Sequence, residues 1–450
     1  MKQGRFLTCV SFLLVFGAAW AQGTFRTTFQ ATCLEPGTVH TTCGRRLDET
    51  VMQGLAHLRW TGDGVQPLLA ERWDVEAGGQ AFIFYLRQGV TWHDGEPFTA
   101  DDVVFSYNLY ANPEVASPYA SKLASVKGYA AFQSGEADSL AGVTKIDDHT
   151  VRVEMEQPSP LWVDLQQISL SILPEHLLGD VPAAQINGHR FWTERVGTGP
   201  FIWNSYQPGQ FVEVVKNPDY FLGEPKLERI IYQIYDEIPT FMNALEAGEV
   251  DMMKYEGGGI PISELERFQA MDHLVTLPMP AGLPTFIAFN HNDERFQDKR
   301  VRQAFLYAID RQAIVDSLLY GAPEVANTMF PAEWARPDDL NQYEYNPDKA
   351  RELLAEAGWN SSEPIVFAYY YRDDVYANVV VAIQQYLAEV GINIEPRLVD
   401  SATLNAMRDD GSFELGLFAN GQGLDPSVGS IITACVGGFF TLGYCNERVD

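Results

Sequence analysis

The chain has 450 residues, of which 60 are acidic and 31 are basic, so its formal net charge is −29. Because 46% of the residues are hydrophobic, a disordered acidic protein is excluded. The surplus of carboxylates, spread along the chain, argues against nucleic acid as a partner, since phosphates would be repelled. The length allows about three domains.

Residues 1–21 have the pattern of a secretory signal peptide. Lys2 and Arg5 precede an apolar run over residues 6–20, and Ala19-Trp20-Ala21 offers a cleavage site. No later stretch reaches the ~18 consecutive apolar residues that a membrane span needs. We therefore expect a protein that is exported without a lipid anchor to the periplasm or another extracytoplasmic compartment.

Four cysteines remain after removal of this signal peptide, and they fall into two local pairs. Disulfides are favoured in an oxidising compartment, and a zinc site is the alternative, although no CxxC motif and no neighbouring pair of histidines supports it. Pairing within each local pair is preferred among three possible connectivities. The cysteines are Cys33, Cys43, Cys435 and Cys445.

The first half of the chain predicts strands around one well-capped helix. Residues 81–86 are apolar and aromatic, as in a buried strand, and Asp94-Gly95 indicates a tight turn. Thr99 is the expected N-cap of a helix, and Asp102 stands where a capping box needs an acceptor. Residues 151–155 alternate as in a half-buried strand. The expected buried face of the helix comprises Val103, Val104, Tyr107 and Tyr110.

The second half predicts alternating helices and strands. Asp298 is expected to cap one helix, and another should begin at Asn346-Pro347 and end at Gly358. Then follow a strand at 365–371, a helix at 374–389, a strand at 392–398 and a strand at 414–418. A strand, a helix of about 16 residues and a second strand form a βαβ unit, which implies a parallel sheet. The predicted fold class is α/β, with several lobes.

The search for catalytic motifs is negative. The sequence has no GxSxG, HExxH, GxxxxGK[ST] or GxGxxG motif, and its eight histidines are scattered singly. We therefore nominate no catalytic residue, no metal ligand and no cofactor. With 60 acidic residues some carboxylate pair is inevitable, so a secreted glycan hydrolase stays open as an alternative class.

Two motifs could carry chemistry but favour a structural role. His93 next to Asp94 could be a base and its orienting partner, yet a turn with local packing explains the pair better. Tyr369, Tyr370 and Tyr371 with Trp359 could form a stacking platform for a ligand. Since alternate residues of a strand face opposite sides, at most one or two of the three tyrosines would reach a cleft.

The order of motifs resembles the extracytoplasmic solute-binding proteins of peptide-type ABC importers, family 5. The resemblance runs from about residue 24 to the end of the chain. Its most specific part covers residues 67–73, 84–90 and 93–103, and its later parts are Gly197-Thr198-Gly199-Pro200-Phe201, residues 217–221, 289–290, 298–304, 308–311 and 350–359, and Asp425-Pro426.

The resemblance implies a periplasmic-binding-protein clamp of two lobes with an additional inserted domain. Lobe one would comprise residues 22–56 and 193–278, the inserted domain residues 57–192, and lobe two residues 279–450. The lobes would close on the ligand by hinge motion near Met279-Pro280 and beyond Asp425. Family members usually continue with helices that return to lobe one, so the chain looks truncated at Asp450.

The resemblance also implies the ligand-binding residues. Peptide-binding members carry an aspartate three residues before the acidic-Pro pair, where it pairs with the ammonium group of the peptide, and here that position is Gln422. A buried ammonium without an anionic partner is costly, so Gln422 points to an oligosaccharide, whereas the family as a whole favours peptides. The nominated contacts are Phe286, Arg408, Phe418, Asn420 and Gln422.

The predicted function is therefore capture of a ligand outside the cytoplasm and its delivery to the membrane permease of an ABC importer. A di- or oligopeptide is the preferred ligand, an oligosaccharide is the alternative, and metal chelates and other solutes stay open behind them. We expect a monomer that carries no cofactor and binds no nucleic acid.

Overall fold

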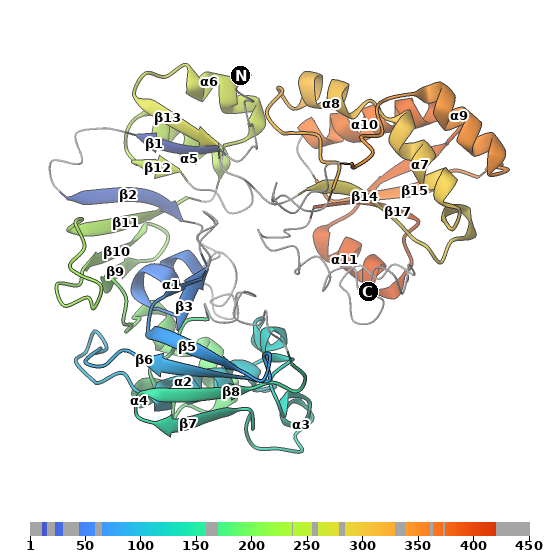
Figure 1. Ribbon diagram of the computed structural model, residues 1–450. Helices are drawn as coiled ribbons and strands as arrows, with labels where there is room; N and C mark the ends of the chain where they lie inside the picture. Colours follow the sequence, from blue (N-terminus) through green and yellow to red (C-terminus); the bar gives the residue numbers. More distant parts are fainter. Residues whose placement is uncertain are drawn as a thin grey trace. The chain divides into compact units, whose positions relative to one another are not determined.

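The computed structural model describes residues 11–15, 23–29, 45–58, 65–158, 170–235, 237–253, 260–278, 284–328, 339–360, 363–371 and 374–419 (Figure 1). The chain folds into two compact units. The first consists of Phe12–Ile260 and Arg267–Leu277, and the second of Pro278–Asp450 with the short segments Met1–Ser11 and Pro261–Glu266.

A seven-stranded sheet organises one part of the first unit. Its central strand β2 pairs in parallel with β11 on one side and with β12 on the other, and its remaining described pairs are antiparallel. In spatial order the strands are β13 (Leu274–Pro278), β1 (Ser11–Val15), β12 (Met252–Met253), β2 (Thr24–Phe29), β11 (Arg229–Ile234), β10 (Phe211–Lys216) and β9 (Phe201–Gln207).

Strand β1 lies inside the predicted signal peptide. It pairs antiparallel with β12, with Leu13 opposite Met253. The chain here uses part of the predicted leader as a strand, as the high β propensity of Phe and Val allows. Cleavage of the leader stays a prediction.

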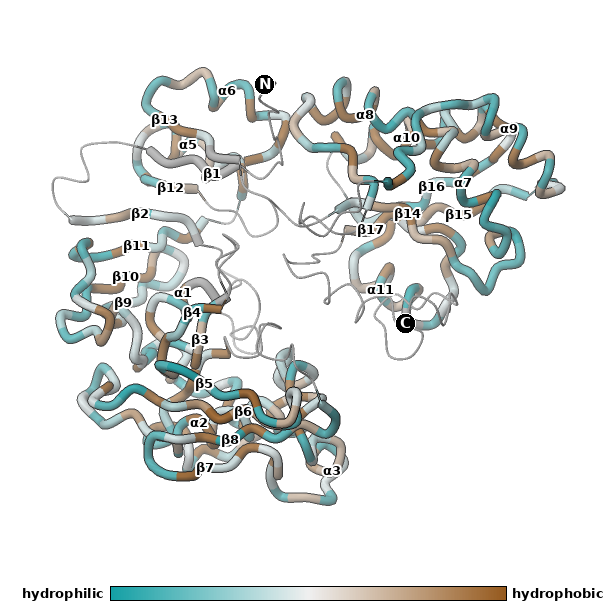
Figure 2. Tube along the Cα trace, viewed as in Figure 1, coloured by the Kyte–Doolittle hydropathy of each residue, from teal (hydrophilic) through white to brown (hydrophobic). Residues whose placement is uncertain are grey.

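A second, four-stranded antiparallel sheet comes from residues 70–154. Its order is β5 (Ala70–Glu76), β6 (Ala81–Leu86), β8 (Thr150–Glu154) and β7 (Val143–Asp147), and β3 (Ala56–Leu58) and β4 (Val65–Pro67) form a separate pair. The hydrophobic colours of Figure 2 gather on the inner strands β6 and β8, where Phe82, Phe84, Val151 and Val153 are fully buried.

Short helices surround these sheets. They are α1 (Arg45–Val51), α2 (Ala100–Ala111), η3 (Ala120–Leu123), α3 (Tyr129–Gln133), α4 (Glu175–Leu178), η6 (Ala183–Gly188), η7 (Arg190–Thr193) and α5 (Ile238–Glu246). The turn η8 (Ile262–Glu264) is assigned to the second unit, and the bounds of α6 (Leu265–Gln269) include the division after Glu266. The longest of them, α2, packs against β7 and β8.

Helix α2 begins as predicted. Thr99 and Asp102 form the capping box, in which the Thr99 backbone N–H donates to Asp102 Oδ2 over 2.9 Å. The buried Asp102 carboxylate also accepts hydrogen bonds from Trp92 Nε1 and from the backbone N–H of Glu175. The Asp102 side chain therefore connects the turn before α2, the first turn of α2 and the start of α4.

His93 has a structural role, as expected. Gly197 N–H donates to His93 Nδ1 over 3.2 Å, so Nε2 carries the proton and donates to the carbonyl oxygen of Gly199 over 3.0 Å. Gly197 and Gly199 in turn lie against α1, where a Cβ on Gly197 would come within 1.8 Å of the Val51 oxygen. The Gly-Thr-Gly motif thus allows two backbones to meet, and His93 holds them together.

One continuous hydrophobic core serves both sheets of the first unit. It runs from Leu47 in α1 through Phe82 and Tyr107 to Val212 and Ile234. A smaller core lies around α5, with Phe241 and Phe268 at its centre. The predicted division of these residues into lobe one and an inserted domain stays a prediction.

The second unit contains a four-stranded sheet with the predicted βαβ unit. The order is β14 (Thr285–Phe289), β17 (Leu415–Ala419), β15 (Ile365–Tyr369) and β16 (Ile394–Leu398). β15 is parallel to both β16 and β17, and β14 is antiparallel to β17.

Helices cover both faces of this sheet (Figure 1). One face packs its residues Ile287, Phe367 and Leu417 against α7, α9 and α10, while Ala288, Ala368 and Phe418 on the other face pack against α11. The helices are η9 (Glu294–Phe296), α7 (Lys299–Ala308), α8 (Arg311–Leu318), α9 (Pro347–Glu356), α10 (Asp374–Glu389) and α11 (Ser401–Asp410).

The predicted caps of these helices are present. Asp298 accepts a hydrogen bond from Arg300 N–H at the start of α7, and Asn346 accepts one from Lys349 N–H at the start of α9. Among the described residues, no helix is long and apolar enough to cross a membrane.

Candidate functional site

The predicted site residues of the second unit gather at one edge of its sheet. Ligands of α/β proteins bind outside the carboxyl ends of parallel strands. β15 and β17 end at this edge, and the antiparallel β14 begins there (Figure 1). In the register of β14 and β17, Thr285 lies opposite Ala419 and Phe286 opposite Phe418. We call this region the carboxyl edge.

Phe286 and Phe418 form a stacked pair on the face that α11 covers. Their ring centroids are 6.3 Å apart with an interplanar angle of 26°, and Phe413 meets Phe418 edge-on at 6.0 Å. Only 4% of Phe418 is exposed, and its ring lies over Gly416, where a Cβ would come within 2.3 Å of a ring carbon. Phe418 is thus part of the hydrophobic core of the second unit. Contact between its ring and a ligand stays a prediction.

Arg408 lies on α11 and is also buried. Its Nη1 donates to Asn405 Oδ1 over 3.1 Å, and its backbone oxygen accepts from Gly411 N–H at the end of the helix. Asn420 and Gln422 lie outside the described residues, as do the four cysteines and the predicted hinge segments. Their predicted roles remain predictions.

The tyrosines after β15 are arranged differently from the prediction. The strand ends at Tyr369, so the alternation of side chains that we expected through residue 371 does not apply. The rings of Tyr370 and Tyr371 are 4.3 Å apart, and Tyr376 from the first turn of α10 stacks on Tyr371, also at 4.3 Å. The sequence analysis did not include Tyr376 in the expected platform. Its position at the start of the helix that follows the strand could have indicated that it lies near Tyr371. We call Tyr370, Tyr371 and Tyr376 the tyrosine stack.

The hydroxyl groups of this stack lie close to Thr285 of β14. Thr285 Oγ1 and Tyr376 Oη are 3.4 Å apart and share a hydrogen bond. The hydroxyl of Tyr371 is buried and lies beside the hydroxyl groups of Tyr370 and Thr285. Burial, together with the neighbouring Tyr370 hydroxyl, raises the pKa of Tyr371 well above its usual value, so this phenol stays protonated at neutral pH.

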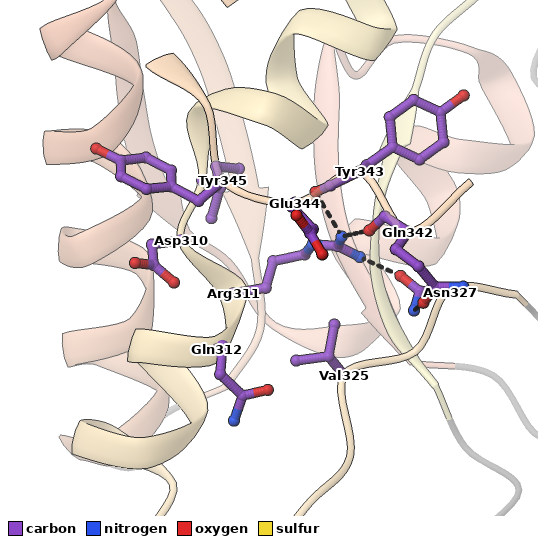
Figure 3. Close-up of a pocket in the computed structure, with 10 residues that line it drawn as sticks. Asp310, Arg311, Gln312, Val325, Asn327, Gln342, Tyr343, Glu344 and Tyr345 are labelled. Carbon is purple, nitrogen blue, oxygen red and sulfur yellow. Dashed lines mark hydrogen bonds between the residues drawn. The ribbon is translucent and has the colours of Figure 1, made fainter. Parts of the chain in front are cut away.

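The second unit also has an open pocket of about 300 Å³ (Figure 3), and its lining residue Tyr345 packs edge-on against Tyr386 near the end of α10. Helix α10 starts at the carboxyl edge and runs back along the sheet, so the cavity lies toward the opposite edge. Its lining residues are Ile309, Asp310, Arg311, Gln312, Val325, Asn327, Gln342, Tyr343, Glu344 and Tyr345.

Arg311 anchors the loops around this cavity. Its guanidinium donates to the backbone oxygens of Gln342 and Tyr343 and to Asn327 Oδ1 over 2.6 to 3.1 Å (Figure 3). It also donates to the backbone oxygen of Ala326 over 3.3 Å. Burial lowers the pKa of Arg311 from its usual value, yet so basic a group keeps its charge. Because four oxygens occupy its donors, we assign Arg311 a structural role.

The described residues contain no group of three or more His, Cys, Asp or Glu side chains that could hold a metal ion.

Comparisons with known proteins agree with this arrangement. The family model "Bacterial extracellular solute-binding proteins, family 5 Middle" matches residues 64–438. A putative ABC transporter peptide-binding protein of Brucella ovis is 34% identical over 343 residues, which cover 75% of this chain and 61% of that protein. The oligopeptide-binding protein AppA of Bacillus subtilis is 29% identical over 343 residues, 73% of this chain and 60% of AppA.

Solved structures share the fold. The ABC transporter substrate-binding protein CtaP of Listeria monocytogenes superimposes with a TM-score of 0.76 at 22% identity, covering 95% of this chain and 84% of that chain. The chain spans about three fifths of the length of the curated relatives named above. Since the family model covers most of the sequence, the chain belongs to the bacterial extracellular solute-binding proteins of family 5.

Proposed function

We propose that the chain captures peptides outside the cytoplasm and delivers them to the membrane permease of an ABC importer. Proteins of family 5 are transport components and not enzymes, so we do not propose the glycan hydrolase considered from the sequence. The observation that carries the proposal is the carboxyl edge, where stacked rings and hydroxyl groups from β14, β15 and α10 gather at the place where α/β sheets bind ligands.

The ligand class is the finer part of the proposal. The names of the Brucella and Bacillus relatives refer to peptides, and aromatic rings with a few polar groups suit a peptide that is bound without covalent chemistry. The absence of a carboxylate at position 422 is the feature that favours an oligosaccharide. Export, a periplasmic location and a monomeric state belong to the same proposal.

Titration calorimetry with defined ligands tests the proposal. The ligands are dialanine, trialanine, pentaalanine, maltotriose and cellotriose, and each is recovered afterwards for mass spectrometry. We expect saturable binding of at least one peptide with micromolar affinity, which corresponds to about −8.2 kcal/mol. If only the sugars bind, the proposed ligand class is an oligosaccharide and not a peptide. Recovery of cleaved ligand would contradict a transport role.

A further inference from the structure

We propose that His93 is a pH-sensitive latch between the turn before α2 and the segment Gly197-Thr198-Gly199. The latch is closed when the imidazole ring is neutral, and it opens when the ring is protonated. The inference concerns a conformational device inside the first unit and does not depend on which ligand the chain binds. It predicts a local opening at acid pH while the sheets of the unit stay folded.

Three hydrogen bonds around one residue form the closed latch. The backbone N–H of His93 donates to the Gly197 oxygen over 2.8 Å, and the Gly197 N–H donates to His93 Nδ1 over 3.2 Å. On the other side of the ring, Nε2 donates to the Gly199 oxygen over 3.0 Å. One ring nitrogen is therefore an acceptor and the other a donor, and only the neutral ring with its proton on Nε2 meets both requirements.

Protonation of the ring removes the acceptor. An imidazolium carries an N–H on both nitrogens, so Nδ1 can no longer accept from the Gly197 N–H, and two N–H groups would face each other. Burial, which lowers the pKa of His93, also keeps water from taking the place of the lost acceptor. The bond from Nε2 to Gly199 survives protonation, so we expect the latch to break at Gly197.

The segment that the latch holds is packed tightly against α1. A Cβ on Gly197 would come within 1.8 Å of the Val51 oxygen, and the Gly199 N–H donates to the same oxygen over 2.8 Å. Asn217 Nδ2 donates to the Gly199 oxygen over 3.1 Å, which connects the segment to the residues after β10. Release of Gly197 should therefore loosen the contact of this segment with the end of α1, whereas Asn217 keeps Gly199 in place.

Asp94 is the charged group that acts on the His93 ring. Its carboxylate raises the pKa of His93, against the larger effect of burial, and it also pairs with His176 of α4 over 2.8 Å. Other titratable side chains lie on the elements packed around the latch. Among the described side chains these are Glu96 in the same turn, Asp102 on α2, Glu175 on α4, Glu49 on α1, Glu194 and Arg195 before the Gly-Thr-Gly segment, and Asp219 after β10.

Two measurements on the 450-residue chain between about pH 7.5 and about pH 4.5 test the latch. NMR of ¹⁵N-labelled histidine gives the midpoint of His93 protonation. Hydrogen exchange read by mass spectrometry, corrected for the intrinsic exchange rate at each pH, gives the protection of peptides that contain Gly197. We expect this protection to fall about fivefold to tenfold, the value of one lost hydrogen bond. The fall should coincide with the His93 titration, below pH 6.5, while peptides from β6 and β8 keep their protection.

Three substitutions identify the group that responds. His93→Gln cannot be protonated, yet its amide oxygen can accept from the Gly197 N–H, so the fall should disappear. Asp94→Asn removes the charge that favours protonation, so the fall should move to lower pH. This second variant tests the latch even if His93→Gln folds poorly. His149→Gln is the matched control, because His149 also has a buried Nδ1 but lies in the turn before β8, and it should behave like the parent.

The outcomes decide the latch separately from the proposed function. If His93 is protonated and the Gly197 peptides keep their protection, the latch is wrong. A fall that persists in His93→Gln would assign the response to another group, and an equal fall in the β6 and β8 peptides would assign it to unfolding of the unit. Both results would contradict the latch. None of these measurements involves a ligand, so the proposed transport role is unaffected by them.

Discussion

Phe418 can lie flat against the sheet only because residue 416 has no side chain. A Cβ at this position would come within 2.3, 3.0 and 3.1 Å of three carbons of the Phe418 ring. The ring is itself held by Phe286 and Phe413, so it cannot move without disturbing the face that packs on α11. This glycine is required by a close approach, since it has no positive φ.

Gly416→Ala should therefore destabilise the second unit. We expect a loss of about 1 to 3 kcal/mol in the free energy of unfolding, the usual cost of overpacking, measured by urea denaturation. Gly188→Ala is the matched control, because a Cβ there would meet no atom within 4 Å. Equal stability of the two variants would show that the Phe418 ring is free to move.

Gln422 is the residue on which the choice of ligand depends most. We expect Gln422→Asp to strengthen peptide binding and to weaken oligosaccharide binding, because a carboxylate supplies the missing partner for an ammonium group and removes an amide that suits hydroxyls. Calorimetry with trialanine and maltotriose measures both effects, and Gln422→Glu tests whether the position of the charge matters. Unchanged affinity for both ligands would mean that residue 422 does not face the ligand.

His93 should make the stability of the first unit depend on pH. Burial, the largest effect, lowers the pKa of His93 below its usual 6.5, although Gly199 and Asp94 act in the opposite direction. Between the two pKa values, His93 binds a proton in the unfolded chain but not in the folded chain. The free energy of unfolding therefore falls as the pH drops through 6.5 toward the lower pKa of His93 in the folded chain.

Urea denaturation between about pH 8 and about pH 5.5 measures this dependence. His93→Gln, which cannot be protonated, should show a smaller decrease than the parent. The remaining decrease belongs to other groups such as His291, whose pKa is also lowered by burial. An identical pH profile for the variant would contradict the assignment of a neutral His93.

At the scale of single elements, local signals decided which predictions succeeded. The bounds of β6 and α10 agree with the sequence, because the first is a short apolar run between turns and the second is followed by Gly391 at a φ of +87°. The strand predicted at 365–371 is two residues too long, because Tyr370 and Tyr371 have high β propensity. Tertiary stacking against Tyr376 overrides that preference, and no pattern within one element could reveal it.

The start of α2 depends on one carboxylate, and a substitution there tests how much the cap contributes. Asp102 accepts from Thr99, Trp92 and Glu175, and its burial raises its pKa although these hydrogen bonds lower it. We expect Asp102→Asn to cost about 1 to 3 kcal/mol in urea denaturation, since an amide cannot accept all of these bonds.

Asp101 provides the control for this substitution. It occupies the same turn but pairs with Lys145 at the exposed surface, where ion pairs contribute little. Asp101→Asn should change the free energy of unfolding by less than about 0.5 kcal/mol. Similar losses for both substitutions would show that general charge, and not the cap, sets the stability of α2.

At the scale of the whole molecule, the family motifs indicated the fold because residues far apart in the sequence pack together in it. The Gly-Thr-Gly segment and His93 are about a hundred residues apart in sequence, and they meet where α1 ends. The carboxyl edge could be located from the βαβ pattern alone, whereas the pairing of Phe286 with Phe418 requires a register that local patterns do not encode. The strand β1 within the predicted leader was likewise not predictable, because a signal peptide and a strand can both consist of a short apolar run.

The two units have separate hydrophobic cores, and this leads to a prediction about cooperativity. The core of the first unit joins both of its sheets, and the cores of the second unit lie on the two faces of one sheet. We expect urea unfolding of the chain in two steps, because cooperative units follow contiguous cores.

Gly416→Ala should shift only the step of the second unit, and Asp102→Asn only that of the first. Hydrogen exchange read by mass spectrometry assigns each step, with peptides from β17 reporting on one and peptides from α2 on the other. If either substitution accelerated exchange equally in both peptides, the chain would unfold as one cooperative body and the division into two units would have no energetic meaning.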